Sequence, residues 1–157
     1  MLWIGSDNGL NQYDAKSQSF IHYYHQATDP YNPNISLSNS LSNSLSNSLS
    51  NNSIRNITED NGGTLWISTY TGVDQLDNTR TRFSHYQHRI SKTEFSNKLV
   101  LSLYQDNKGT LWIGTLGGGI HTVNTGQKDF GHIKHDGQNP SSLSDKAILS
   151  IYQDSQN

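Results

Sequence analysis

The 157-residue chain contains no cysteine, which excludes disulfide bonds, thiolate catalysis and cysteine-ligated metals. It has no long apolar run: the longest, Leu99–Tyr104, is far shorter than a membrane span. The N-terminal sequence MLWIGSDNG has neither a basic nor an apolar stretch, so we expect no signal peptide and no membrane insertion. The net charge is only −2, without a long run of either sign, and we therefore expect no nucleic-acid partner.

What the chain does contain is a repeated tryptophan string. LWIGS at Leu2–Ser6 returns as LWIST at Leu65–Thr69 and as LWIGT at Leu111–Thr115. Each copy is followed, in the same order, by a glycine-led segment, a phenylalanine that opens the pattern F-x-H-x-x-H, a polar linker, and a β-type run that ends in aspartate. Such regular recurrence predicts an array of one structural unit.

The spacing between the strings is uneven for a visible reason. Trp66 and Trp112 are 46 positions apart, whereas Trp3 and Trp66 are 63 apart. The longer interval contains Ser36–Asn51, in which SLSN occurs four times in succession. Its leucines recur at every fourth position, as on one face of a helix, but serine and asparagine are poor helix formers. We predict that residues 36–51 form a mobile, solvated loop between units, expanded from one SLSN element.

Each unit holds four strand-length segments separated by turn residues. The turns DNGGT at Asp60–Thr64 and DNKGT at Asp106–Thr110 lie between β-rich runs, which is a strong hairpin signal. Four short strands in a unit of this length are typical of a β-propeller blade. We therefore predict an all-β fold of about three four-stranded antiparallel blades.

The units are predicted at residues 2–64, 65–110 and 111–157 of a single partial propeller region, 1–157. The run Ile148–Asp154 lacks its hairpin partner and Leu2–Ser6 lacks its predecessor, so one blade is expected to be split between the two termini. Closed rings have at least four blades. We therefore expect either part of a longer propeller or a homo-oligomeric ring, in which two copies would give six blades.

The units resemble the two-component regulator propeller repeat in four successive motifs. These are LWIG(S/T)-x-x-G-L-x-x-Y-D, F-x-x-Y, D-P-x-N-P-N-S-L-S-x-N-x-I and I-x-x-D-x-x-G-x-L-W. The resemblance implies a periplasmic ligand-sensing propeller of a hybrid histidine kinase or a diguanylate cyclase. It also implies an oligosaccharide or another small molecule as ligand, and the rest of a longer sensor chain as partner.

Residues that recur in every unit are interpreted as structural. A repeated tryptophan is expected to fill the space between blades, and a repeated aspartate to cap its own turn. The alternatives are a ligand-stacking platform and a glycosidase carboxylate pair. We predict no catalytic residue and no cofactor. The structural set comprises Trp3, Trp66, Trp112, Gly5, Gly114, Asp60, Asp106, Asp154, Phe20, Phe83 and Phe130.

Six of the seven histidines form H-x-x-H pairs, a pattern that suggests metal binding. In a strand, however, residues i and i+3 point to opposite faces, so we predict no metal site and expect these rings to cover a half-exposed outer strand. His121 lies outside the pattern, beside a glycine turn, and is the one candidate for ligand contact. The pairs are His22/His25, His85/His88 and His132/His135.

These observations favour a non-catalytic, ligand-sensing propeller segment of a two-component sensor, with the ligand on loops at one face. The first alternative is a scaffold or lectin-like propeller that assembles as a homo-oligomer. The second is a propeller glycosidase or lyase, for which the sequence offers no unique acid/base constellation.

Overall fold

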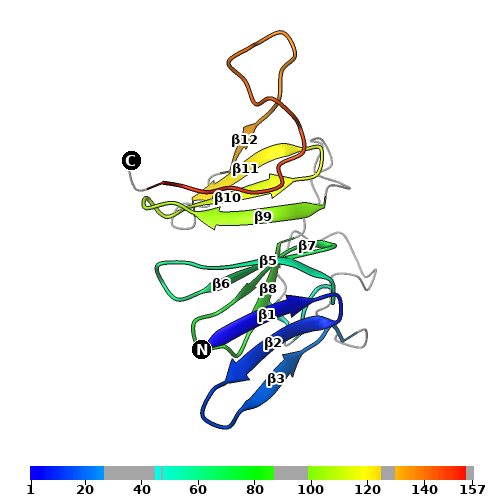
Figure 1. Ribbon diagram of the computed structural model, residues 1–157, viewed down its shortest axis with the longest axis vertical. Coiled ribbons are helices and arrows are strands. Elements are labelled where there is room, and N and C mark those ends of the chain that lie inside the picture. Colours follow the sequence, from blue (N-terminus) through cyan, green and yellow to red (C-terminus); the bar gives the residue numbers. More distant parts are fainter. Residues whose placement is uncertain (27–44, 47, 87–98, 125–129, 155–157) are drawn as a thin grey trace. The chain divides into compact units, whose positions relative to one another are not determined.

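A computed structural model describes residues 1–26, 45–46, 48–86, 99–124 and 130–154. The fold is all-β, as predicted, with three antiparallel sheets (Figure 1). The chain divides into two compact units, Met1–Arg89 (unit 1) and Ile90–Asn157 (unit 2). Among the described residues, no helix is long and apolar enough to cross a membrane.

Unit 1 contains two sheets, in which successive strands form hairpins except that β4 pairs with β8. The first sheet has the order β1-β2-β3, and the second has the order β4-β8-β7-β6-β5. Every neighbouring pair is antiparallel. The strands are β1 (Leu2–Ser6), β2 (Gly9–Asp14), β3 (Ser19–Tyr23), β4 (Leu45–Ser46), β5 (Ile54–Glu59), β6 (Leu65–Thr69), β7 (Gly72–Leu76) and β8 (Phe83–Tyr86).

Unit 2 contains one four-stranded sheet with the order β12-β11-β10-β9. It repeats the hairpin succession of β5 to β8, with the LWIGT string on the second strand. The strands are β9 (Val100–Gln105), β10 (Thr110–Thr115), β11 (Gly119–Asn124) and β12 (Phe130–Ile133).

The core of unit 1 lies between its two sheets. Seven apolar side chains are buried there, and Trp3, Tyr23 and Ile57 pack against them. Gly5 of the LWIG string lets the sheets approach closely, because a Cβ at this position would lie 2.5 Å from Ile54 Cγ2. The buried set is Leu10, Leu49, Ile54, Leu65, Ile67, Leu76 and Phe83.

The SLSN tract differs from its prediction at its end. Residues 36–44 and 47 lie outside the described part of the chain, but Leu45–Ser46 pairs with β8, and Ser48, Leu49 and Ser50 are buried. The prediction of a solvated loop is therefore wrong for Ser48–Ser50. Leu49 is fully buried in the core because the linker passes between the sheets on its way to β5.

The predicted β-type run at the C-terminal end also differs. Ala147–Asp154 forms no strand; its one ladder contact is an isolated bridge between Leu116 and Ala147. The segment nevertheless docks on the unit 2 sheet: Ile148 N donates to Thr115 O (3.0 Å), and Ser102 Oγ donates to Ile148 O (3.4 Å). A Cβ at Gly114 would lie 2.8 Å from Ile148 Cγ2, so this glycine repeats the role of Gly5.

Candidate functional site

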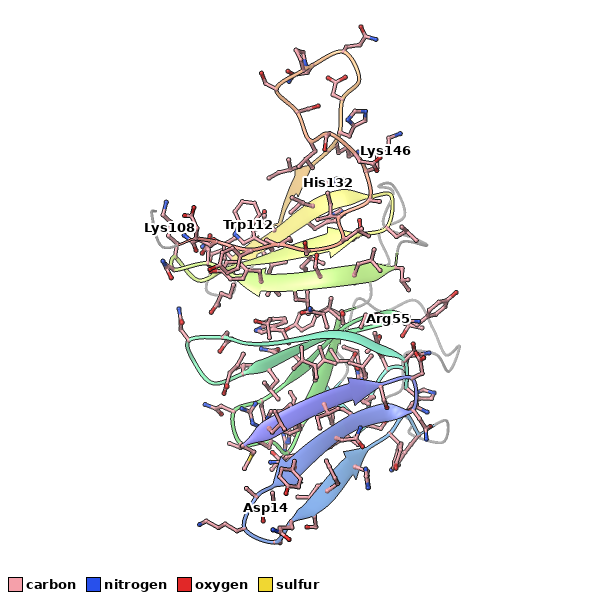
Figure 2. The ribbon with its side chains drawn as sticks, viewed as in Figure 1. Asp14, Arg55, Lys108, Trp112, His132 and Lys146 are labelled. Atoms are coloured by element: carbon pink, nitrogen blue, oxygen red, sulfur yellow. The ribbon has the colours of Figure 1, made fainter. Side chains whose placement is uncertain are left out.

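Each unit has one end where hairpin turns meet the linkers between sheets, and we call it the linker end. In unit 1, Gly9 N donates to Asn52 O (2.8 Å) and Tyr70 N donates to Ser53 O (3.1 Å). In unit 2, the amides of Gly117 and Gly119 both donate to Lys146 O, at 3.0 and 2.8 Å. Figure 2 shows Arg55 at this end of unit 1 and Asp14 at the opposite end.

The linker end of unit 1 gathers charged, hydroxyl and aromatic groups. Ser53 Oγ donates to Asp7 Oδ1 (2.8 Å), and Arg55 Nη2 lies 3.7 Å from the same oxygen. The Arg55 and Asp7 side chains are 41% and 80% exposed, so this ion pair is worth little for stability and is open to a ligand. Tyr70, anchored through its amide on Ser53, is 62% exposed.

One turn position at the linker end varies between repeats. It directly follows the tryptophan string and is occupied by Asp7, Tyr70 and Leu116, all of which are exposed. The flanking positions are constrained by the turn: the hydroxyls of Ser6, Thr69 and Thr115 donate to the carbonyls of Gly9, Gly72 and Gly119. Exposed side chains that vary on a constant frame are where ligand-specific contacts arise. Sequence comparison of the repeats could have found this position.

Beneath the linker end of unit 1 is a buried polar cluster. Asp74 on β7 lies opposite His85 on β8, with 2.8 Å between Asp74 Oδ1 and His85 Nδ1. Asp74 Oδ2 accepts the amide of Ser50 (2.8 Å), and Ser50 Oγ lies 3.0 Å from Thr69 Oγ1. This arrangement fixes the linker to the second sheet, because a buried carboxylate needs several donors.

The cluster is not arranged as a hydrolytic triad. A triad places a nucleophilic hydroxyl at the histidine nitrogen that faces away from the carboxylate. Here the Ser50 hydroxyl contacts Thr69, and His85 Nε2 is buried without a hydrogen-bond partner among the described residues. A substrate would also have to reach a carboxylate that is 0% exposed.

The first histidine of each H-x-x-H pattern occupies one register position. His22, His85 and His132 lie on β3, β8 and β12, each directly opposite a residue of the preceding strand, β2, β7 or β11. That opposite residue is Asn11, Asp74 or His121, so His121, although outside the H-x-x-H pattern, occupies a register position that recurs in all three sheets.

His121, the candidate ligand contact, is half-buried in unit 2. Its ring stacks on that of His132, with centroids 3.9 Å apart and planes at 21°. His132 Nε2 in turn donates to Gly118 O (2.7 Å) in the glycine turn. The stack therefore braces the turn next to Leu116. Among the described residues, no group of three or more metal-ligating side chains occurs.

The second histidine of the pattern holds the linker. His25 Nδ1 donates to Leu49 O (2.8 Å), and His135 Nδ1 donates to Leu143 O (2.6 Å). In both cases the carbonyl belongs to the leucine of an SLS sequence. His88 lies outside the described residues.

The Trp–Asp pairs lie at the end of the strands opposite to the linker end. Trp66 Nε1 donates to Asp60 Oδ2 (3.0 Å), and Trp112 Nε1 donates to Asp106 Oδ2 (2.9 Å). The other oxygen of each carboxylate accepts two amides of its own turn. Burial raises the pKa of Asp106, but these donors outweigh burial and hold the pKa below its ordinary value of 3.8.

A tyrosine and a glutamine lie next to the tryptophan of the repeat, and their interaction was not predicted from the sequence. Tyr23 packs on Trp3 and donates to Gln12 Oε1 (2.9 Å); Tyr86 packs on Trp66 and donates to Gln75 Oε1 (2.8 Å). Burial raises the pKa of both tyrosines, offset in part for Tyr23 by the nearby Arg80 cation. The recurring sequences G-x-x-Q and F-x-H-Y could have indicated this tyrosine–glutamine pair.

The recurring phenylalanines are not equivalent. Phe83 is 2% exposed and meets the edge of Tyr23 across the two sheets (centroids 5.9 Å apart). Phe20 is 48% exposed and packs on Tyr13 of its own sheet. Phe130 pairs with Val123 in the backbone ladder of unit 2.

Comparison with known proteins finds a family that matches two stretches of the chain. Residues 48–71 and 94–117 match the two-component regulator propeller family. No curated protein sequence matches the chain.

Solved structures with the same fold include extracellular domains and a surface component of bacteria. The extracellular domain assigned to hybrid two component system BT3049 of B. thetaiotaomicron is 28% identical with a TM-score of 0.63; the match covers 85% of this chain and 16% of that one. The extracellular domain assigned to hybrid two component system BT4673 of the same organism is 19% identical with a TM-score of 0.61. This match covers 96% of this chain and 23% of that one.

PorZ of Porphyromonas gingivalis, a surface component of the type-IX secretion system, is 14% identical (TM-score 0.52; 97% and 28% covered). This chain therefore spans only 16–28% of the length of these structures. At such low identity, the PorZ and BT4673 matches establish the fold alone.

Proposed function

We propose that this chain, two stretches of which match the two-component regulator propeller family, is a ligand-sensing segment of a two-component sensor. The segment would belong to the extracytoplasmic, periplasmic part of that sensor. The observation that carries the proposal is the 28% identity to a hybrid-system extracellular domain over 85% of this chain. The segment acts by binding and not by catalysis, because the recurrent carboxylates and histidines are occupied in holding turns and linkers.

The ligand site is the linker end, and in unit 1 it comprises Asp7, Arg55 and Tyr70. Exposed Tyr70 is anchored on Ser53, which also bonds the Asp7 carboxylate; together with the Arg55 guanidinium these groups offer an aromatic face and both hydrogen-bond polarities. Oligosaccharides present matching features, with apolar C–H faces and many hydroxyls. Because Asp7 and Tyr70 occupy the turn position that varies between repeats, they can determine specificity without disturbing the frame.

Titration calorimetry of the purified chain against a panel of neutral oligosaccharides tests this proposal. We expect saturable binding by at least one glycan, recovered chemically unchanged by chromatography. Tyr70→Ala and Asp7→Asn should weaken that binding at least tenfold. Phe20→Ala removes a half-exposed aromatic ring outside the site and should leave affinity unchanged.

Conversion of the glycan would overturn the non-catalytic assignment. Failure of every glycan to bind would overturn the carbohydrate assignment. Binding that is lost equally in the Phe20→Ala control would overturn the location of the site.

A further inference from the structure

The linker that enters the core of unit 1 carries one short sequence several times. Residues 36–51 read SLSN four times in succession, and Leu49 of the last copy is fully buried in the core. Leu45 of the preceding copy lies in the backbone ladder with β8. The core therefore takes up one leucine from a linker that offers the same leucine at four positions.

The contacts of the last copy use groups that every copy contains. Leu49 O accepts a hydrogen bond from His25 Nδ1 (2.8 Å). Ser50 donates its amide to Asp74 Oδ2 (2.8 Å), and its hydroxyl lies 3.0 Å from Thr69 Oγ1. An even shift of an extended chain keeps its side chains on the same faces. A shift by one copy would therefore present the same leucine and serine to the same partners.

Asn52 is the first residue that distinguishes the last copy from the others. The earlier copies are each followed by serine, whereas the last copy is followed by Asn52. Asn52 Oδ1 accepts the amide of His25 (2.7 Å), and Asn52 O accepts the amide of Gly9 (2.8 Å). Any residue at this position offers a carbonyl, but serine has no side-chain amide oxygen. The bond from His25 N to the Asn52 side chain therefore belongs to one register only.

We propose that this linker has two registers and that Asn52 selects the one described above. In the second register, Leu45 and Ser46 occupy the positions of Leu49 and Ser50, and the preceding copy offers the same Leu-Ser pair to β8. The shift moves four residues from the upstream linker to the connection with β5, at the linker end.

The second register is disfavoured only about tenfold. Its main cost is the lost side-chain hydrogen bond of Asn52, because the entropy of closing a loop changes slowly with loop length. The linker thus holds a replacement for its own core residue. This inference concerns the linker and does not depend on which ligand the linker end binds.

Two matched substitutions measure the exchange. Leu10 and Leu49 are both 0% exposed in the same core, but only Leu49 follows an identical sequence copy. Leu10→Ala should lower the ratio of folded to unfolded chains about a hundredfold or more, as is usual for a buried leucine. Leu49→Ala should lower this ratio only about tenfold, because Leu45 takes the vacated position. Urea unfolding followed by circular dichroism gives both ratios.

Removal of the other leucines of the tract should abolish this difference. In a chain that already carries Leu37→Ala, Leu41→Ala and Leu45→Ala, adding Leu49→Ala should cost as much as Leu10→Ala does. A small cost in this background as well would overturn the proposal, because it would show that the core closes around alanine without a second leucine. A hundredfold cost of Leu49→Ala in the unaltered tract would overturn it too.

Nuclear Overhauser contacts of assigned leucine methyl groups identify the leucine that occupies the core. Contacts with core side chains should come from Leu49 in the unaltered chain and from Leu45 in Leu49→Ala. Asn52→Ser removes the selecting amide and should give contacts from both leucines in one sample. Asn8→Ser, at an exposed turn position, should give contacts from Leu49 alone.

Two outcomes of this experiment would contradict the proposal. Absence of core contacts from Leu45 in Leu49→Ala would overturn the second register. Core contacts from Leu49 alone in Asn52→Ser would overturn the role of Asn52.

Discussion

Asp74 and His85 form a fully buried pair, with 2.8 Å between Oδ1 and Nδ1 and side-chain exposures of 0% and 1%. The pair joins two neighbouring strands, and through the Ser50 amide it also holds the linker that enters the core. The same register position in the first sheet holds Asn11 and His22, which are joined at 2.7 Å near solvent. One repeat position therefore serves as a core anchor in one sheet and a surface contact in another.

Asp74→Ala should destabilise the chain by about 3 kcal/mol, because it leaves the Ser50 amide and the His85 ring buried without their acceptor. Asn11→Ala, at the equivalent exposed position, should cost less than about 1 kcal/mol. Urea unfolding followed by circular dichroism measures both values. Equal losses for the two variants would show that burial does not determine the strength of this contact.

Acid should weaken the hydrogen bond between Trp112 and Asp106. The hydrogen bonds hold the folded-state pKa of Asp106 below 3.8, so its carboxylate stabilises the fold above that pH. This contribution is lost as the pH falls from about 3.8 through the folded-state pKa. Asp106→Asn and Trp112→Phe should each be less stable than the unaltered chain at pH 7 and show a shallower decline between pH 5 and 2. The urea concentration at the midpoint of unfolding, measured across this pH range, tests the prediction. Parallel pH dependences for all three chains would contradict the role assigned to the Asp106 carboxylate.

Gly5→Ala should destabilise unit 1 by about 1–3 kcal/mol, because the new methyl group would overlap Ile54 at the close approach of the two sheets. Adding Ile54→Val should recover part of the loss. Gly137→Ala is the control: its Cβ would meet no atom closer than 3.9 Å, so stability should change by less than about 0.5 kcal/mol. Thermal unfolding of the four chains gives the comparison.

His135→Ala should release the linker between residues 136 and 146 without unfolding the sheet. It removes the ring that donates to Leu143 O at 2.6 Å, a loss of about 1 kcal/mol. Hydrogen exchange should accelerate at the Asn139 and Ser142 amides, which bond within this linker, and remain slow in β10. Gln138→Ala, an exposed side chain in the same linker, should leave the exchange rates unchanged. Equal acceleration in β10 would indicate global destabilisation instead.

The features predicted well from the sequence are local ones. Within the part of the chain that the structure describes, the Asp60 carboxylate accepts hydrogen bonds from residues two to six positions away, including Trp66, so the turn sequence itself contains the groups of the Trp–Asp pair. The strands follow for the same reason, because turn residues separate β-forming runs at fixed intervals. Apart from β4, which pairs with β8, the order of strands within each sheet then results from successive hairpins.

The features missed or mistaken depend on distant packing. Ser50 lies 24 positions from Asp74, and its serine-rich surroundings gave no sign of burial. His121 lies outside the H-x-x-H sequence pattern, and its partner, His132, is defined only by the register of β11 with β12. The run Ala147–Asp154 has the composition of a strand, but a strand requires a partner, and pairing is a property of the assembled sheets.

The sequence by itself determined the repeated unit, its four strands, its turns and the blade architecture, because these follow from residue preferences and hydrogen bonds within a few positions. The tertiary structure decided which copies of a repeated residue are buried: Phe83 enters the core where Tyr23 packs against it, whereas Phe20 remains half exposed. Identical motifs experience different neighbours, and burial depends on those neighbours and not on the motif.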